Sequence, residues 1–194
     1  MGGVARLTRL RWALSSLGAK PNGRESLDLL IDAEDLPGDG WRVTDERTWK
    51  TGHVEPSAAW SAAARDHGSV TAWRSFEQPS TGRWIWAEVV PLASSSDAQE
   101  ALTALPTLLL KNTRADVTVV AEKALPLPEI PSATVGWAHA QETDSRRGPG
   151  DAFYLAASVD GVIAVTCASG LRDVWTFADV VAAVTRQCRR IATN

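Results

Sequence analysis

The sequence predicts an α+β protein in which a largely antiparallel sheet of about six to seven strands is covered by helices. Short segments with alternating apolar and polar residues recur between turn residues, a pattern typical of β-hairpins. Other segments carry apolar residues at helical spacing behind capping residues. Strands joined by tight turns pair antiparallel, and helices covering that sheet give a single-domain sandwich.

Length and charge limit the class of protein. The chain has 194 residues, which suffices for one substantial core and is short for two. The net charge of −3 argues against a nucleic-acid binder, which needs a cationic surface. No segment has the length and hydropathy of a membrane span.

The charge distribution suggests a boundary near the N-terminus. Residues 1–24 are basic and are expected to form a peripheral arm, whereas residues 25–194 are expected to form a single α+β domain. We expect a cytoplasmic protein. The alternative is secretion through a weak N-terminal signal. Residues 12–19 follow basic residues and form a short apolar segment, which two serines interrupt.

The first elements alternate between helix and strand. A short helix is expected over residues 25–35, and the Pro-Gly turn at residues 36–40 ends it. A strand follows over residues 41–51. Pro56 then opens a second helix, which Gly68 closes.

The central segment reads as a hairpin with arms at residues 69–77 and 83–92. Setting Glu77 against Arg83 fixes its expected register, because residues 78–82 have turn composition. One hairpin face would then present aromatic rings beside an arginine, and Trp73 would lie on the other. The expected cross-strand pairs are Phe76–Trp84 and Arg74–Trp86 on the first face, and Trp73–Ala87 and Ser75–Ile85 on the second.

The following segment contains a helix and two strands. Ser96 and Gln99 form a capping box for a helix that Pro106 kinks or ends. Strands are expected over residues 116–122 and 133–141. A polar loop is expected over residues 142–151.

The C-terminal part carries the clearest signals. Strands at residues 152–159 and 162–168 flank Asp160-Gly161, the signature of a type I′ turn. Thr176 caps the last helix, whose apolar face is regular. That face consists of Phe177, Val180, Val181, Val184, Cys188 and Ile191.

Catalytic and metal-binding motifs are missing from the sequence. The three histidines have no metal-ligand spacing, and no phosphate-binding loop or nucleophile elbow occurs. We therefore expect neither a catalytic residue, nor a metal site, nor a cofactor. Cys167 and Cys188 have the surroundings of buried thiols, although a bridge between them is possible if the last helix packs over that strand.

Nine tryptophans, against three phenylalanines and one tyrosine, are the most unusual feature. A tryptophan combines a large apolar area with one N–H group, so it serves both cores and binding surfaces. Three of the nine lie on the central hairpin. The candidate binding residues for a ligand or partner are Trp84, Trp86, Arg74, Glu88 and Phe76. The alternative is that these rings pack under the helices.

One segment suggests a family. Residues 29–41, Leu-Leu-Ile-Asp-Ala-Glu-Asp-Leu-Pro-Gly-Asp-Gly-Trp, resemble the opening of actinobacterial sensor-type domains. These include the extracellular sensor domain of a mycobacterial Ser/Thr protein kinase and LpqN-like lipoproteins. The order of the elements is similar too. The resemblance implies a PsbP-like α/β/α sandwich that binds a ligand or partner, and it supplies no catalytic residues.

We therefore expect a non-enzymatic binding domain whose ligand is an unknown small molecule or protein. One alternative is a small enzyme with a site assembled by the fold from His53, His139 or Cys167. Another is a structural subunit of an oligomer, such as a homo-oligomer, because interface cores are rich in aromatic residues.

Overall fold

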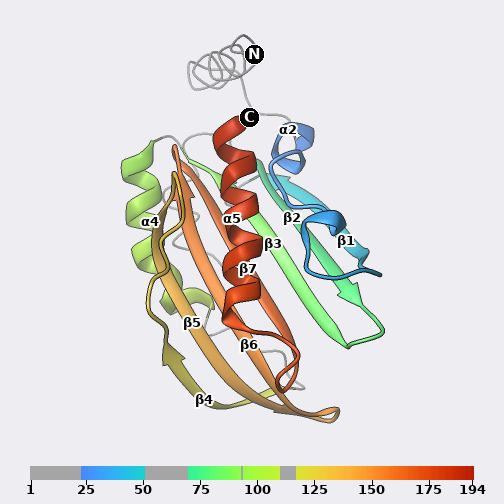
Figure 1. The fold of residues 1–194 in the computed structure, drawn as a ribbon. Coiled ribbons are helices and arrows are strands. Elements are labelled where there is room, and N and C mark those ends of the chain that lie inside the picture. The colour runs from blue at the N-terminus through green and yellow to red at the C-terminus, as the bar shows by residue number, and fades with distance from the viewer. Residues whose placement is uncertain (1–22, 51–69, 93, 110–116) are drawn as a thin grey trace.

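The computed structural model describes residues 23–50, 70–92, 94–109 and 117–194. Seven strands form one antiparallel sheet in the order β1-β2-β3-β7-β6-β5-β4 (Figure 1). The predicted α+β class with an antiparallel sheet of six to seven strands is confirmed. The strands are β1 (Arg42–Lys50), β2 (Val70–Gln78), β3 (Arg83–Pro91), β4 (Val117–Ala124), β5 (Thr134–Ser145), β6 (Gly148–Val159) and β7 (Val162–Leu171).

The sheet consists of two meanders that meet at its centre. Strands β1, β2 and β3 form the first meander, and β4 to β7 form the second. The last strand of each, β3 and β7, pair antiparallel and join the two halves, with Ile85 opposite Ala168.

Two turns of the second meander test the sequence-based predictions. The turn between β6 and β7 has positive φ at Asp160 (47°) and Gly161 (85°), so the predicted type I′ hairpin is confirmed. The polar loop predicted over residues 142–151 is wrong. Instead β5 runs on to Ser145 and β6 resumes at Gly148, because exposed polar residues can extend a hairpin beyond the covered sheet.

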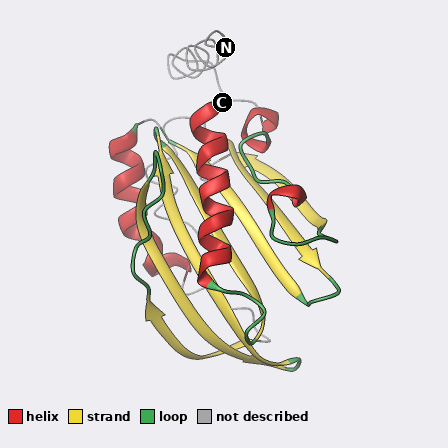
Figure 2. Ribbon diagram, in the orientation of Figure 1, coloured by secondary structure: helices red, strands yellow, loops and turns green. Residues whose placement is uncertain are grey.

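Helices cover both sides of the sheet (Figure 2). Helix α5 (Phe177–Thr193) packs on β6 and β7 from one side, which we call the α5 face. Helix α4 (Ser95–Leu109) packs on β5, β6 and β7 from the other side, the α4 face. Neighbouring residues of a strand point to opposite faces, so each strand contributes alternate side chains to two separate cores.

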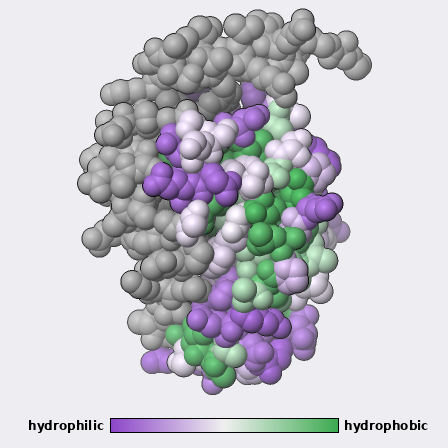
Figure 3. All heavy atoms as spheres, turned by 90° about the vertical axis from the view of Figure 1, so that its left-hand side faces the viewer, coloured by the Kyte–Doolittle hydropathy of each residue, from purple (hydrophilic) through white to green (hydrophobic). Residues whose placement is uncertain are grey.

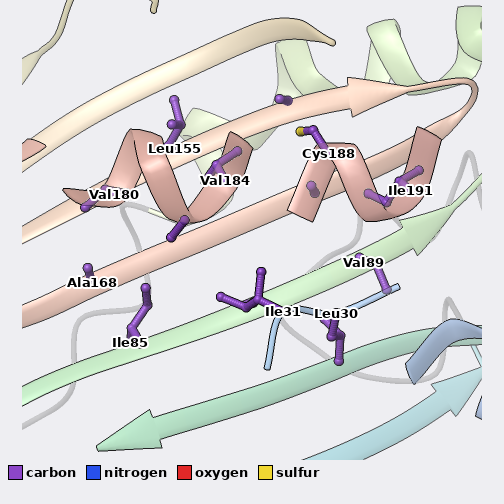
Figure 4. Packing of buried hydrophobic residues seen from close by; sticks show 14 of the residues in the cluster. Leu30, Ile31, Ile85, Val89, Leu155, Ala168, Val180, Val184, Cys188 and Ile191 are labelled. Atoms are coloured by element: carbon purple, nitrogen blue, oxygen red, sulfur yellow. The ribbon is translucent and has the colours of Figure 1, made fainter. Parts of the chain in front are cut away.

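The larger core lies under α5. Val180, Val184 and Cys188 project from the helix onto Leu155 of β6 and Ala168 of β7 (Figure 4). Thr176 caps this helix, because its Oγ1 accepts a hydrogen bond from the backbone N–H of Asp179 at 3.2 Å. The prediction of the last helix is therefore confirmed in both its cap and its apolar face.

The helix predicted over residues 25–35 is wrong. Helix α2 (Gly23–Leu27) covers only its start, and a short 3-10 helix η1 (Ala33–Asp35) ends the segment. Between them Leu29, Leu30 and Ile31 are all fully buried, which places consecutive side chains in the core in a way that a one-faced surface helix does not allow.

The rest of this segment is tied to the α5 face by aromatic contacts. The Trp41 ring lies 5.6 Å from that of Trp175, and its indole N–H donates to the Pro37 carbonyl at 3.1 Å. Trp175 also receives the Arg83 guanidinium at 5.0 Å from its ring centroid. The motif on which the family resemblance rests therefore builds the core in this chain.

The smaller core lies under α4. It combines Ala98, Ala101 and Leu102 of the helix with β-strand residues such as Trp137 and Ile163. The helix comes close to the sheet at Gly136, where a Cβ would lie 2.8 Å from the Leu102 side chain. Because a side chain would clash at that point, the glycine permits the close approach.

The start of α4 differs from the prediction. The capping residue is Ser94, whose Oγ accepts a hydrogen bond from the Asp97 backbone N–H at 3.1 Å, and the predicted Ser96 lies inside the helix. Two serines near the same helix start can both begin a capping pattern, and the chain uses the earlier one. The helix also continues past Pro106 to Leu109.

Some predictions concern residues outside the described part of the chain. These are nearly all of the basic arm at residues 1–24, the helix at residues 56–68, and the side chains of Trp12, Trp49 and Trp60. Within the described residues, no helix has the length and hydropathy needed to cross a membrane.

The side of the molecule that carries β4 and α4 shows a mixed surface (Figure 3). Hydrophobic side chains form a band with hydrophilic ones above and below it. The edge strand β4 carries exposed charges, including Glu122 and Lys123. Charges along an edge strand discourage pairing with a further strand.

Candidate functional site

The central hairpin has a register one residue away from the predicted one. Gln78, rather than Glu77, pairs with Arg83. Gln78 stays in the strand because its Nε2 donates to the Asp39 carbonyl at 2.6 Å and its Oε1 accepts from the Thr81 hydroxyl at 2.6 Å. The predicted register is therefore wrong, since contacts from outside the hairpin lengthen β2 by one residue.

The shift changes which side chains share a face. Because side chains alternate along a strand, a slip of one residue exchanges the faces of one strand relative to its partner. Trp73 therefore joins Trp84 and Trp86, whereas the prediction set it on the opposite face. We use the name tryptophan ladder for the six residues of the three cross-strand pairs on the α4 face. The pairs are Trp73–Glu88, Ser75–Trp86 and Glu77–Trp84.

Of the five candidate binding residues, Trp84, Trp86 and Glu88 lie in the ladder. Their side chains are half-buried, and Trp86 packs against the smaller core under α4. Phe76 and Arg74 lie on the α5 face instead. Phe76 is fully buried in the larger core, where it faces Ile85 across the strands.

Arg74 makes ion pairs in place of the predicted contact with Trp86. Its Nε lies 2.6 Å from a carboxylate oxygen of Glu46, and its Nη1 lies 2.5 Å from Asp32. The same Nη1 donates to the Ile31 carbonyl at 3.0 Å. Arg190 of α5 also forms an ion pair with Asp32, with its Nη1 3.1 Å from the Asp32 Oδ2. These contacts tie the segment before β1 to β2 and to α5, so Arg74 serves the architecture.

Glu88 is the unusual charge of the ladder. No hydrogen bond or ion pair to its carboxyl is found among the described residues, and burial raises the pKa of Glu88 to about 7. Its backbone carbonyl does have a partner, the Nε2 of Gln187 in α5, at 3.1 Å. The strand is therefore bonded to α5 from one face, and the Glu88 side chain lies on the α4 face.

A row of polar and aromatic residues continues from the ladder across the sheet. In direct register, Trp86 faces Cys167 of β7, which faces Tyr154 of β6, which faces His139 of β5. The Tyr154 hydroxyl and the Trp86 indole lie close enough to the Cys167 thiol to lower its pKa through hydrogen bonding.

Cys167 lacks the properties of a nucleophile. Burial raises the pKa of its thiol to about 12, with the two hydrogen bonds acting in the opposite direction. A thiol with such a pKa is protonated at neutral pH and unreactive. His139 lies two strands away, a distance of about 10 Å, which is too far to take its proton directly.

His139 is a buried histidine at the far end of this row. Its ring stacks on Trp137 with centroids 5.6 Å apart, and its buried Nε2 has no hydrogen-bond partner among the residues that the structure describes. The nearest carboxylate, that of Glu122, lies 3.6 Å from Nε2. No group of three metal-ligating side chains occurs within the described ranges, and His53 and His67 lie outside them.

The two cysteines are free, so the disulfide that the sequence left open does not form. Cys167 points to the α4 face beside Tyr154, whereas Cys188 of α5 belongs to the core on the α5 face. The sheet itself separates the two thiols. Helix α5 does pack over β7, but on the side from which Cys167 points away.

Sequence reasoning set Trp73 on the wrong face and missed Glu77 and the row from Cys167 to His139. The alternation of side chains places Trp73 correctly once Gln78 is paired with Arg83. The row across β7, β6 and β5 had no local signal, because its register is set by strands far apart in the sequence.

Comparisons with known proteins support the fold and leave the site unassigned. No protein-family model and no curated protein matches the chain. A solved structure, the extracellular domain of PknH from Mycobacterium tuberculosis, matches with a TM-score of 0.61 and 10% sequence identity, over 90% of this chain and 98% of that one. An uncharacterized protein from Mycobacterium smegmatis gives a TM-score of 0.42 at 11% identity, over 80% of this chain and 90% of that one.

The match to the PknH domain defines the class of fold, because it covers nearly the whole of both chains. This chain has an α+β sandwich like that of the extracellular domain of a mycobacterial protein, as the family resemblance implied. The low identity limits the likeness to the fold.

Proposed function

We propose that the chain is a non-catalytic binding module and that the tryptophan ladder is its binding surface. The observation that carries this proposal is the register of the β2–β3 hairpin, which gathers on one face three half-buried tryptophans and a carboxyl that has no partner among the described residues. Aromatic side chains with a few polar groups are the usual lining of ligand sites. The fold likeness to the PknH extracellular domain supports a binding role in general terms.

We also propose that the chain is related to a particular group of sensor-type domains. The Leu29–Trp41 motif favours a relation to LpqN-like domains and a PsbP-like sandwich, and the fold is compatible with that relation.

The cellular location of the protein is a proposal as well. The sequence favours the cytoplasm, whereas the likeness to an extracellular domain supports secretion; fractionation of cells that produce the full chain would decide between them.

The binding role can be tested by NMR of the tryptophan indole N–H groups. The variants Trp73→Phe, Trp84→Phe and Trp86→Phe identify the three ladder resonances. The protein is then titrated with benzyl alcohol, methyl β-glucoside and choline as aromatic, sugar and cationic probes. We expect at least one probe to shift the ladder resonances while the buried Trp41 and Trp175 stay unchanged.

The proposal fails if no probe moves the ladder resonances, or if acrylamide does not quench the fluorescence of the ladder. Trp175→Phe is the matched control, because Trp175 is buried on the α5 face and its indole N–H is already bonded to the Ser169 carbonyl at 3.0 Å. Its replacement should not change the response of the ladder.

A further inference from the structure

We propose that the ligand of the tryptophan ladder carries a positively charged group of the alkylammonium class, held against Glu88 between Trp73 and Trp86. This inference rests on the binding role proposed above and adds the chemistry of the ligand. Its basis is the arrangement of one carboxyl and two aromatic rings on adjoining positions of the hairpin.

The position of Glu88 gives it aromatic neighbours on two sides. Trp73 lies directly opposite on β2, and side chains in such pairs have Cβ atoms about 5 Å apart. Trp86 precedes Glu88 by two residues on the same strand and therefore on the same face. On the β7 side the partner is Val165, which is buried and apolar.

Among the described residues, the carboxyl of Glu88 also has no partner of the kind that other acidic groups have. Asp32 and Glu46, on the other face, share Arg74. Asp45 pairs with Arg47 on β1. A half-buried carboxylate without a partner is destabilised, and a cation placed beside it would remove that cost.

The rings of the ladder are able to bind a cation as well. The Arg47 guanidinium already lies 6.0 Å from the centroid of Trp73, although the Arg47 side chain is mainly exposed. A cation is attracted to the negative face of an indole, most strongly where water is partly excluded. Trp86, which lies opposite Cys167, places a second ring on the same face as this carboxyl.

Other ligand chemistries fit these groups less well. An anion would meet the Glu88 carboxylate without a free cation in the ladder to compensate it. A neutral sugar could stack on the rings, but it would leave the buried charge uncompensated. An alkylammonium group satisfies both features, because its methyl or methylene surface packs on indole rings while its charge faces the carboxylate.

The test compares choline with 3,3-dimethylbutan-1-ol, its uncharged analogue of nearly the same shape, at pH 8. Binding is followed by the ladder indole resonances of the full chain. Choline should bind at least about tenfold more tightly than the alcohol, and Glu88→Gln should abolish that preference. Glu129→Gln, the same change at an exposed residue outside the ladder, should alter choline binding by less than about twofold.

The outcomes separate this inference from the binding role on which it rests. If the alcohol binds as tightly as choline, or if Glu88→Gln leaves choline binding unchanged, the inference is overturned and the ladder remains a binding surface. If Glu129→Gln weakens choline binding as much as Glu88→Gln, the effect belongs to overall charge and the inference is overturned too. If neither compound nor any other probe shifts the ladder resonances, both proposals fall.

Discussion

The two faces of the sheet use the same strands for different purposes. On the α5 face, Phe76 and Ile85 are fully buried, and ion pairs of Arg74 and Arg190 fasten the segment before β1 onto the core. On the α4 face, helix α4 contacts β5, β6 and β7, while Trp84, Trp86 and Glu88 of β3 are half-buried. One face is closed by packing and charge pairing, whereas on the other the Glu88 carboxyl has no partner within the described part of the chain.

The difference shows how a single strand can serve stability and binding at once. Along β3, Ile85, Ala87 and Val89 point into the large core, and the residues between them form part of the ladder. The effect of a substitution in β3 on stability should therefore depend on the face to which the side chain points. Between Trp84 and Val89, odd-numbered residues lie in the larger core, and even-numbered ones lie in the ladder. The following predictions test that contrast, beginning with the largest expected effect.

Truncation on the α5 face should be the most damaging change. Phe76→Ala removes a fully buried ring from the larger core and should lower the free energy of unfolding by about 3–5 kcal/mol. Trp84→Ala, on the half-buried ladder, should cost less than about 2 kcal/mol. Urea unfolding followed by circular dichroism measures both. Equal losses would mean that the faces do not differ in the way described.

Glu88→Gln should stabilise the protein at alkaline pH. The pKa of Glu88 is raised from 4.5 to about 7, so the folded protein holds a proton that the unfolded chain releases between these values. The wild-type contribution therefore becomes less favourable as pH rises through that window, by at most about 3 kcal/mol. Unfolding of both proteins at pH 5 and pH 8 gives the effect by difference.

The matched control for this prediction is Glu77→Gln, on the same face. It should not reproduce the pH-dependent gain in stability. A Glu88→Gln variant whose advantage is the same at pH 5 and pH 8 would contradict the raised pKa.

Arg74→Gln should lower the free energy of unfolding by about 1–2 kcal/mol, because Asp32 and Glu46 lose a nearly buried partner while remaining partly solvated themselves. The loss should shrink in high salt. Arg47→Gln is the control, since the Arg47 side chain is 67% exposed and its pairing with Asp45 should contribute little to stability. A large loss for Arg47→Gln would show that charge on the α4 face is structural as well.

A reducing agent should have the smallest effect, which is none on the thermal midpoint. Cys167 and Cys188 are free and lie on opposite faces of the sheet. Both thiols should react with a thiol reagent after unfolding and resist it before. A midpoint that falls on reduction would require a bond across the sheet and would refute the separation of the faces.

Local signals in the sequence predicted the local structure well. The turn at Asp160-Gly161 and the cap at Thr176 depend on residues within a few positions of one another, so the sequence contains all that is needed to recognise them. The α+β class follows from such elements in order.

The register of the ladder could not be predicted in the same way. It depends on Gln78, whose side chain is held by the backbone of Asp39, a residue from a separate segment. Likewise nothing near Arg74 in the sequence indicates that it will form ion pairs with Asp32 and Glu46 on the α5 face. Of the five candidate residues, Trp84, Trp86 and Glu88 share one face, whereas Arg74 and Phe76 lie on the other.

The meeting of two meanders at β3 and β7 has a kinetic consequence. Hairpins within each meander can form from neighbouring segments, whereas the β3–β7 pairing joins parts of the chain that are far apart and must pay a large loop-closure entropy. Trp86 and its hydrogen-bonded neighbour Cys167 sit on opposite sides of that junction. The orientation of the ladder should thus be completed late in folding, when the two halves of the sheet dock.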